Sequence, residues 1–134
     1  MTVLVAGVAE GEELERLRAR IQRNTHFQVI SHAHTPELAL AHARVLLPDI
    51  TVLTLSGGLG DDPEAFRVLH GVRALDPPGA VVLRARNQAA LDGLDRYAVD
   101  GAVHVVRADD AETLMRALIT IGLRRASCDP DTMP

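Results

Sequence analysis

Short aliphatic runs alternate along the chain with longer segments whose apolar residues recur every three or four positions. Runs that are almost continuously apolar are typical of strands buried on both faces. We therefore predict strands at residues 3–6, 27–30, 50–55, 81–83 and 103–106.

The segments between these strands have the periodicity of amphipathic helices. Apolar residues spaced at i, i+3, i+4 and i+7 fall on one stripe of a helix. Such stripes are formed by Leu14, Leu17 and Ile21; by Ala65, Val68, Leu69 and Val72; by Leu91, Leu94 and Ala98; and by Leu114, Ala117, Leu118 and Ile121. Thr35 and Pro36 are predicted to be the N-cap and first residue of a further helix. The sequence "DPPG" at 76–79 predicts a turn.

Strands that alternate with amphipathic helices imply a parallel sheet with helices on both faces. Residues 1–124 are therefore predicted to form one α/β domain of the flavodoxin-like class, a doubly wound (βα)5 sheet with strand order 2-1-3-4-5. Residues 125–134, "RASCDPDTMP", have no periodicity. They are predicted to be a flexible tail, or the start of a linker to a missing output domain.

Composition narrows the functional classes. The 134 residues are 47% hydrophobic and 24% charged, which is typical of a soluble globular domain. The net charge is −4 and no Lys/Arg cluster is present, so we expect no direct nucleic-acid binding. The single Cys128 cannot form an internal disulfide, and no apolar run reaches the length of a membrane span. We expect a cytoplasmic protein that does not enter a membrane.

With this order of elements, residues 2–124 resemble the receiver domain of two-component response regulators. The stretches that carry the resemblance are "VLVAG" at 3–7, "LLPDITVLTL" at 46–55, "VLHGVRALDP" at 68–77, "VVLRA" at 81–85 and "VDGAVHVVRADDAETLMRAL" at 99–118. The most specific feature is Pro48-Asp49 in front of a run of aliphatic-type residues. Order and spacing together, more than any single stretch, support the resemblance.

The resemblance implies a phosphorylation site at the carboxyl ends of the strands. In the family, two acids and an acceptor aspartate hold Mg²⁺, and a Ser/Thr and a Lys bind the transferred phosphoryl group. The acidic pair falls on Gly7 and Val8, and the acceptor falls on Thr54. The Ser/Thr falls on Arg84, and the Lys is matched by Arg107 if strand 5 contains a small insertion.

None of these positions keeps its usual chemistry. Without carboxylates, Mg²⁺ lacks the hard oxygen ligands it prefers. A threonine hydroxyl is a far weaker nucleophile than a carboxylate unless a base activates it. We therefore interpret the chain as a degenerate pseudo-receiver that is not an enzyme and uses no cofactor or metal. Thr54 is predicted to be structural, with its hydroxyl bonded to a neighbouring backbone group.

Three other groups of polar residues could form binding sites, or could have structural roles alone. Arg84 and Arg107 could bind an anion, or could pair with Asp109, Asp110 or other local acids. His32, His34 and His42 could ligate zinc, but their spacing matches no zinc motif and solvated or capping roles are preferred.

The third group consists of acidic residues in loops, whose carboxylates could bind a metal ion. They are Glu10, Glu12, Glu13, Asp61, Asp62 and Glu64. Acids in a first helical turn more often favour the helix dipole. The "GGLG" stretch at 57–60 lacks the spacing of a phosphate loop and indicates flexible backbone.

The leading hypothesis is a phosphorylation-independent interaction domain of an atypical bacterial response regulator. Its partner is predicted to be a second copy or another signalling protein, bound through helix 4, strand 5 and helix 5. Candidate interface residues are Arg96, Tyr97, Asp109, Asp110, Glu112 and Arg116. The alternative is a small-molecule or anion sensor with its ligand in the crevice formed by Gly7, Val8, Thr54, Arg84 and Arg107.

Overall fold

The computed structural model describes residues 1–55, 63–92 and 103–128, with the side chains of residues 89 and 125–128 excepted. The strands are β1 (Thr2–Ala6), β2 (Gln28–Ala33), β3 (Ile50–Leu55), β4 (Ala80–Ala85) and β5 (Val103–Arg107). The helices are α1 (Glu12–Gln22), α2 (Pro36–Leu46), α3 (Pro63–Arg73), α4 (Gln88–Asp92) and α5 (Ala111–Cys128). Strands and helices alternate in chain order, as the apolar pattern predicts.

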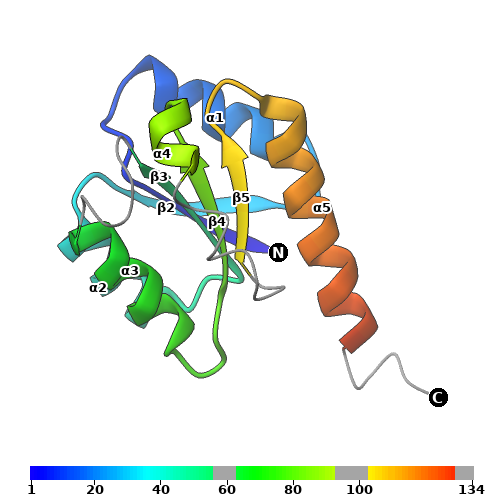
Figure 1. Cartoon of the computed structure of the whole chain (residues 1–134). Coiled ribbons are helices and arrows are strands. Elements are labelled where there is room, and N and C mark those ends of the chain that lie inside the picture. Colours follow the sequence, from blue (N-terminus) through cyan, green and yellow to red (C-terminus); the bar gives the residue numbers. More distant parts are fainter. Residues whose placement is uncertain (56–62, 93–102, 129–134) are drawn as a thin grey trace.

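The five strands form one parallel sheet in the order β2-β1-β3-β4-β5 (Figure 1). This confirms the predicted doubly wound α/β fold. Chain order reverses between β1 and β3, which makes the carboxyl ends of β1, β3 and β4 the place where such folds open a crevice.

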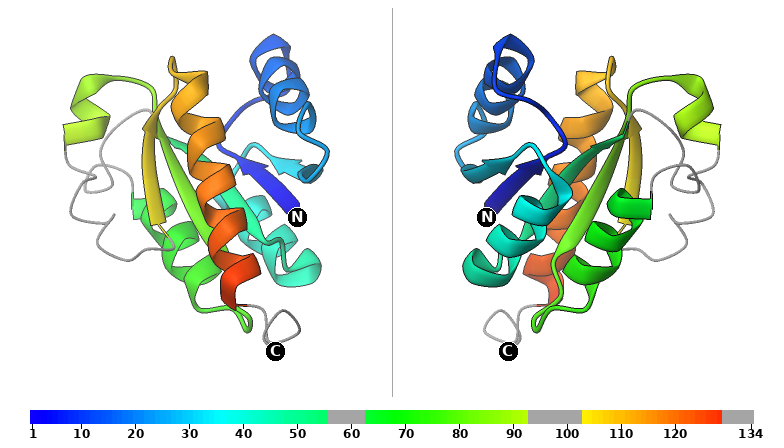
Figure 2. Two further views of the ribbon diagram at one scale, coloured as in Figure 1. Left: turned by 90° about the vertical axis from the view of Figure 1, so that its right-hand side faces the viewer. Right: turned by 90° about the vertical axis from the view of Figure 1, so that its left-hand side faces the viewer.

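Helices cover both faces of the sheet (Figure 2), and an apolar layer lies under them on each face. Leu53 and Leu55 of β3 pack on the side covered by α2 and α3, where Ala90 of α4 also lies. Ile50 and Val52 point to the opposite side, under α1 and α5. The alternation follows from the two-residue period of a strand, and it places Thr54 on the α1/α5 side.

Polar side chains define several element boundaries. The Thr35 hydroxyl accepts a hydrogen bond from the Leu38 N–H at 3.3 Å, and Pro36 follows as the first helical residue, as predicted. At the amino end of the sheet, a carboxylate oxygen of Asp49 accepts bonds from the N–H (2.8 Å) and hydroxyl (3.1 Å) of Thr2. The Thr2 hydroxyl also accepts a bond from the Asp49 N–H at 3.0 Å, so the Pro48-Asp49 feature ties β3 to the start of β1.

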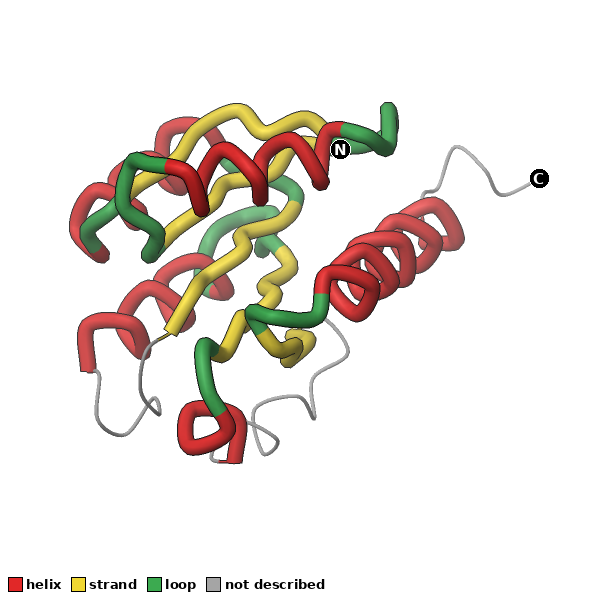
Figure 3. Tube along the Cα trace, turned by 90° about the horizontal axis from the view of Figure 1, so that it is seen from above, coloured by secondary structure: helices red, strands yellow, loops and turns green. Residues whose placement is uncertain are grey.

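Several elements are longer than predicted. β2 continues to Ala33, which pairs with Ala6, although Ser31 and His32 interrupt the apolar run. Polar residues are tolerated there because β2 is an edge strand and those side chains are only half-buried. α5, the long helix next to the C-terminus in Figure 3, passes the predicted boundary at 124 and ends at Cys128. Its apolar stripe ends at Ile121, but its helical backbone continues.

Some predicted features lie outside the described residues. They are the "GGLG" stretch, Asp61 and Asp62, the second half of the helix expected over 91–98 with Arg96 and Tyr97, and the tail beyond 128. None of the helices in the described ranges is long and apolar enough to cross a membrane.

Candidate functional site

The candidate site lies at the carboxyl end of the sheet. Gly7 directly follows β1, Thr54 is near the end of β3, and Arg84 is its register partner on β4. Both Thr54 and Arg84 are buried, with 6% and 8% of their surfaces exposed. The topology therefore brings together three of the positions that the resemblance assigns to the phosphorylation pocket.

Gly7 makes a close backbone approach that no other residue type tolerates. Its φ is +83°, and its N–H donates to the Ala33 carbonyl at 3.0 Å. A Cβ at this position would lie 2.5 Å from the backbone oxygen of Thr54. A side chain here would combine left-handed strain with a direct clash against backbone. The position that the resemblance matches to the first acidic residue therefore has no room for a side chain unless β1 and β3 move apart.

Val8 is part of the core. It is 2% exposed and belongs to the apolar cluster under α1 and α5. A carboxylate in this place would be surrounded by aliphatic side chains, where an ionised group is costly. Val8, which the resemblance matches to the second acidic residue, thus contributes packing in this chain.

Thr54 is bonded to a charged side chain. Its hydroxyl accepts a hydrogen bond from Nη1 of Arg84 at 3.3 Å. The predicted backbone partner is replaced by this side chain because residues 54 and 84 project from neighbouring strands toward the same face of the sheet. The hydroxyl is an acceptor for a fixed cation, and no base among the described residues bonds to it.

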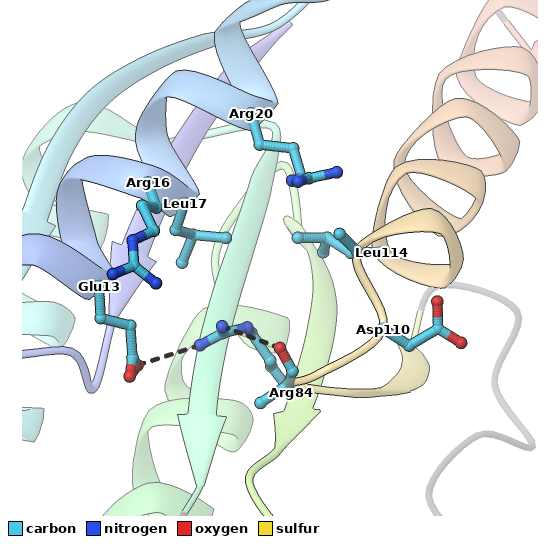
Figure 4. Close-up of a pocket in the computed structure, with 9 residues that line it drawn as sticks. Glu13, Arg16, Leu17, Arg20, Arg84, Asp110 and Leu114 are labelled. Carbon is cyan, nitrogen blue, oxygen red and sulfur yellow. Dashed lines mark hydrogen bonds and ion pairs between the residues drawn. The ribbon is translucent and has the colours of Figure 1, made fainter.

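Arg84 links three parts of the fold (Figure 4). Its Nη1 bonds to Thr54 and forms an ion pair with Glu13 of α1 at 3.4 Å. Its Nη2 donates to the carbonyl of Ala108, just before α5, at 3.1 Å. Figure 4 shows the guanidinium between α1 and the start of α5. A permanent cation thus occupies the mouth of the sheet beside the residue that stands at the acceptor position.

Glu13 is the anionic partner that completes this arrangement. It pairs with Arg86 at 2.8 Å through its second carboxylate oxygen, so one carboxylate joins two arginines. The Arg86 hydrogen bond, and then the positive charge of Arg86 and the contacts with Arg84, hold the pKa of Glu13 below its ordinary value against the opposing effect of burial. From the sequence, Glu13 is only one of several loop acids, because its separation of 71 residues from Arg84 leaves no local signal of this ion pair.

Arg107 does not join the pocket. Its guanidinium donates to Asp109 at 3.1 and 3.0 Å and to the side chain of Gln88 at 3.3 Å, with nearly half of the side chain exposed. Arg84 and Arg107 therefore engage different partners, and Arg107 pairs with Asp109, which is one of the two alternatives given for it.

The other candidate interface acids on this side of the fold have defined positions. Asp110 caps α5: it accepts bonds from the N–H of Thr113 at 3.1 Å and from its hydroxyl at 2.5 Å. These bonds lower the pKa of Asp110. Glu112 is exposed in the first turn of α5, and Arg116 lies one turn further along the helix.

The remaining candidate ligands are dispersed. Glu10 pairs with His32 at 3.2 Å and Glu12 with Arg16 at 2.5 Å. His42 bonds to the Ser31 hydroxyl at 2.6 Å through Nδ1. His34 lines a separate cavity of about 200 Å³ with Gly7, Thr54 and Glu64 on the α2/α3 side. Within the described ranges, no three His, Cys, Asp or Glu side chains are grouped to hold a metal ion.

A cavity of about 300 Å³ lies between α1 and the start of α5. It is lined by Glu13, Arg16, Leu17, Arg20, Arg84, Ala108, Asp110, Ala111 and Leu114. In Figure 4, Arg20 extends from α1 toward α5 and Arg84 lies at the opposite end of the cavity. The lining is therefore more basic than acidic, with three arginines and two carboxylates.

Solved structures share this fold, although no protein-family model and no curated protein matches the sequence. The response regulator domain of Thermotoga maritima CheB has a TM-score of 0.64 and 14% identity, over 91% of this chain and 96% of that one. The receiver domain of a putative response regulator NarL from Mycobacterium tuberculosis has a TM-score of 0.62 and 18% identity, over 88% and 92%. An RcsB structure described as two dimers bound to two parallel DNAs has a TM-score of 0.70 and 14% identity, over 91% and 63%.

The fold is therefore that of response regulator receiver domains. At these identities the likeness concerns the fold alone, and the site must be interpreted from its own residues.

Proposed function

We propose that this domain is a pseudo-receiver that works in signal transduction as a non-catalytic, phosphorylation-independent protein-interaction domain. The observation that carries the proposal is Arg84. Its buried guanidinium contacts Thr54 and pairs with Glu13 at the place where the resemblance puts the acceptor and the phosphoryl group.

Electrostatics and backbone geometry both oppose the receiver reaction. A divalent cation beside Thr54 would meet a fixed positive charge, and Gly7 and Val8 provide no carboxylate to balance it. Restoring an acid at position 7 requires the backbone of β3 to move, because the Cβ site lies 2.5 Å from a carbonyl oxygen. Several residues together, and not Thr54 alone, thus support the proposal that this domain is not phosphorylated.

The experiment is a direct test of phosphoryl chemistry. The wild-type chain is treated with acetyl phosphate and Mg²⁺ and weighed by intact-mass spectrometry, and amide NMR shifts are recorded with beryllofluoride and Mg²⁺. We expect no adduct and no shift changes, and none after Thr54→Asp alone. A stable phosphoryl adduct, or saturable shifts around residues 7, 54 and 84, would refute the proposal.

The α5 face is the surface we assign to the partner. Ile119 and Leu123 are 44% and 66% exposed and are spaced at i, i+4, so they form an apolar strip on this helix. Glu112 and Arg116 precede them on the same helix and provide charged contacts at the edge. Apolar centres with charged rims are typical of protein interfaces. The receiver-fold neighbours that form dimers, such as RcsB, support such a role.

This assignment is tested by affinity capture with identification of the partner, followed by binding measurements on the purified pair. Ile119→Glu should weaken binding at least tenfold, because a charge would be buried at the contact. Thr120→Glu, the next residue on the helix, is the matched control and should bind within about threefold of wild type. Equal losses in both variants, or none in either, would exclude this strip as the partner surface.

A second candidate function is anion or small-molecule sensing, and the cavity between α1 and α5 favours it. Arg16, Arg20 and Arg84 line a space of about 300 Å³, at the small end of the range for ligand pockets. Thermal-shift titrations with inorganic phosphate and small dicarboxylates test it. Saturable stabilisation that is lost in Arg20→Gln would support sensing, and no stabilisation at millimolar concentrations would exclude it for these anions.

A further inference from the structure

Exposed apolar side chains are concentrated on α2. Among the described residues, six large apolar side chains are exposed, and four of them belong to α2 or to its C-cap. They are Leu38 (51%), Val45 (80%), Leu46 (44%) and Leu47 (44%). The other two, Ile119 and Leu123, lie on α5, so α2 carries the larger group of exposed apolar side chains.

Leu38 and Val45, together with Ala41, follow one face of the helix. Leu38, Ala41 and Val45 are spaced at i, i+3 and i+7, and all are exposed, whereas Ala39 and Ala43 on the inner face are fully buried. α2 is thus apolar on both its inner and its outer face. The inner face packs on the sheet, and the outer face faces away from the protein.

Close packing against α3 fixes this orientation. A Cβ on Gly71 of α3 would lie 2.4 Å from Cδ1 of Leu40, so the absence of a side chain lets the two helices approach. Leu40 therefore points toward α3, and the strip of Leu38, Ala41 and Val45 points outward. α2 and α3 lie side by side on the same face of the sheet in Figures 1 and 2.

An acidic and a basic residue flank the strip of Leu38, Ala41 and Val45, in an order that lets two copies of the helix pair opposite charges. Glu37 and Arg44 are seven residues apart, which places them on the same flank of α2. Both line a groove of about 190 Å³ between α2 and α3, together with Glu64 and Arg67 of α3. The acids lie in the first turn of each helix and the arginines further along. Glu37 and Arg44 form no ion pair with another described side chain.

We infer that this face binds a second copy of the chain, with the two α2 helices antiparallel about a two-fold axis. In an antiparallel helix pair, equivalent flanks face each other. Leu38 then packs beside the partner's Val45, and Ala41 faces the partner's Ala41. Glu37 meets the partner's Arg44, and the symmetry repeats this pair. In a parallel pair each flank would face the opposite flank of the partner, and Glu37 and Arg44 would lose this pairing, so the charge order favours the antiparallel dimer.

The small size of this face is consistent with a weak dimer. One helix face with Leu46 and Leu47 at its rim is smaller than the roughly 800 Å² per partner of a standard interface. The dimer is therefore weak, with a dissociation constant of about 10–100 µM. It does not depend on the proposed partner surface of α5, which stays accessible in this arrangement because α5 lies on the other face of the sheet.

Sedimentation equilibrium of the full chain from about 5 to about 300 µM tests the inference, a range that brackets this affinity. Wild type should show a monomer–dimer equilibrium, and Val45→Glu should weaken it at least tenfold. Glu37→Arg and Arg44→Glu should each weaken it about three- to tenfold by opposing like charges twice per dimer. The double variant should return to within about twofold of wild type, because the pair is re-formed with reversed signs.

Thr120→Glu is the matched control, since it places the same charge at an exposed position of α5 that belongs to neither strip and should leave self-association unchanged. Ile119→Glu is measured beside it. Circular dichroism melts establish that each variant is folded. A strict monomer at all concentrations, dimerisation that is insensitive to Val45→Glu, or a double charge reversal that fails to restore dimerisation would each overturn the inference. Loss of the dimer in Ile119→Glu alone would assign self-association to α5 instead and leave the proposed function standing.

Discussion

The two ends of strand β3 use polar residues in different ways. At the amino end, Asp49 and Thr2 form hydrogen bonds with each other. These bonds involve no other element and hold the starts of β1 and β3 together. At the carboxyl end, Thr54 and Arg84 belong to a network that reaches α1 and the segment before α5. Asp49, the acid that this chain shares with the receiver pattern, thus has a structural role.

The contrast explains why the family resemblance is stronger at one end than at the other. Asp49 is required to satisfy backbone and hydroxyl donors at the start of the sheet, whatever the domain does. Gly7, Val8 and Thr54 stand at the positions that the resemblance matches to the carboxylates of the family, and in this chain they contribute packing and a contact with Arg84. The residues that tie β1 to β3 are therefore separate from those at the positions that the resemblance matches to the family's reaction.

The largest effect is expected at Gly7. Gly7→Ala should destabilise the domain by about 3 kcal/mol or more, because it adds left-handed strain to a backbone clash with Thr54. Gly11→Ala is the control, since Gly11 also has a positive φ (+151°) but its Cβ would meet nothing within 4 Å. Urea unfolding should give a clearly smaller cost at Gly11. Equal costs would mean that strain alone, without the close approach of β1 and β3, explains Gly7.

The next largest loss of stability is expected at Asp49, at the amino end of β3. Asp49→Ala removes the acceptor for the N–H and hydroxyl of Thr2 and should cost about 2–3 kcal/mol. Asp49→Asn keeps an acceptor oxygen of similar shape and should recover at least half of that loss. The measurement is the free energy of unfolding in urea. An alanine variant as stable as wild type would show that this tie is not needed to place β1 against β3.

Thr54→Val should cost less, at most about 1–2 kcal/mol, in line with one lost hydrogen bond. Arg84 keeps its contacts with Glu13 and Ala108 in this variant, so the guanidinium is not left unpaired. A double-mutant cycle with Arg84→Met isolates the Thr54–Arg84 coupling, which should be about 1 kcal/mol. Unaltered stability together with lost partner binding would make Thr54 a contact residue and contradict its structural role.

The smallest effect is a pH dependence at Glu13. Because its pKa is lowered in the folded state, chiefly by the Arg86 hydrogen bond, the ionised carboxylate stabilises the fold at neutral pH. This contribution is lost as the pH falls from the ordinary glutamate pKa of 4.5 through the lower folded value. The stability difference between wild type and Glu13→Gln should be largest near about pH 7 and shrink toward about pH 3. A difference that is independent of pH would refute the ion-pair explanation.

Strand and helix positions were predictable because their signals are local. The run from Ile50 to Leu55 and the stripe of Ala65 and Val68 follow from the periods of a strand and a helix. Where polar residues interrupt the pattern, as in β2, the predicted strand was too short. β2 continues through these polar residues because it lies at the edge of the sheet, which the linear sequence does not reveal.

By itself, the sequence determined the alternation of elements, the strand order and the absence of carboxylates at positions 7, 8 and 54. Only the tertiary structure decided that Arg84 pairs with Glu13, that the backbone of Thr54 closes on Gly7, and that α2 is apolar on its outer face. The physical reason is distance along the chain. Periodicity acts between neighbours, whereas Arg84 and Glu13 are 71 residues apart and meet only when the sheet is assembled.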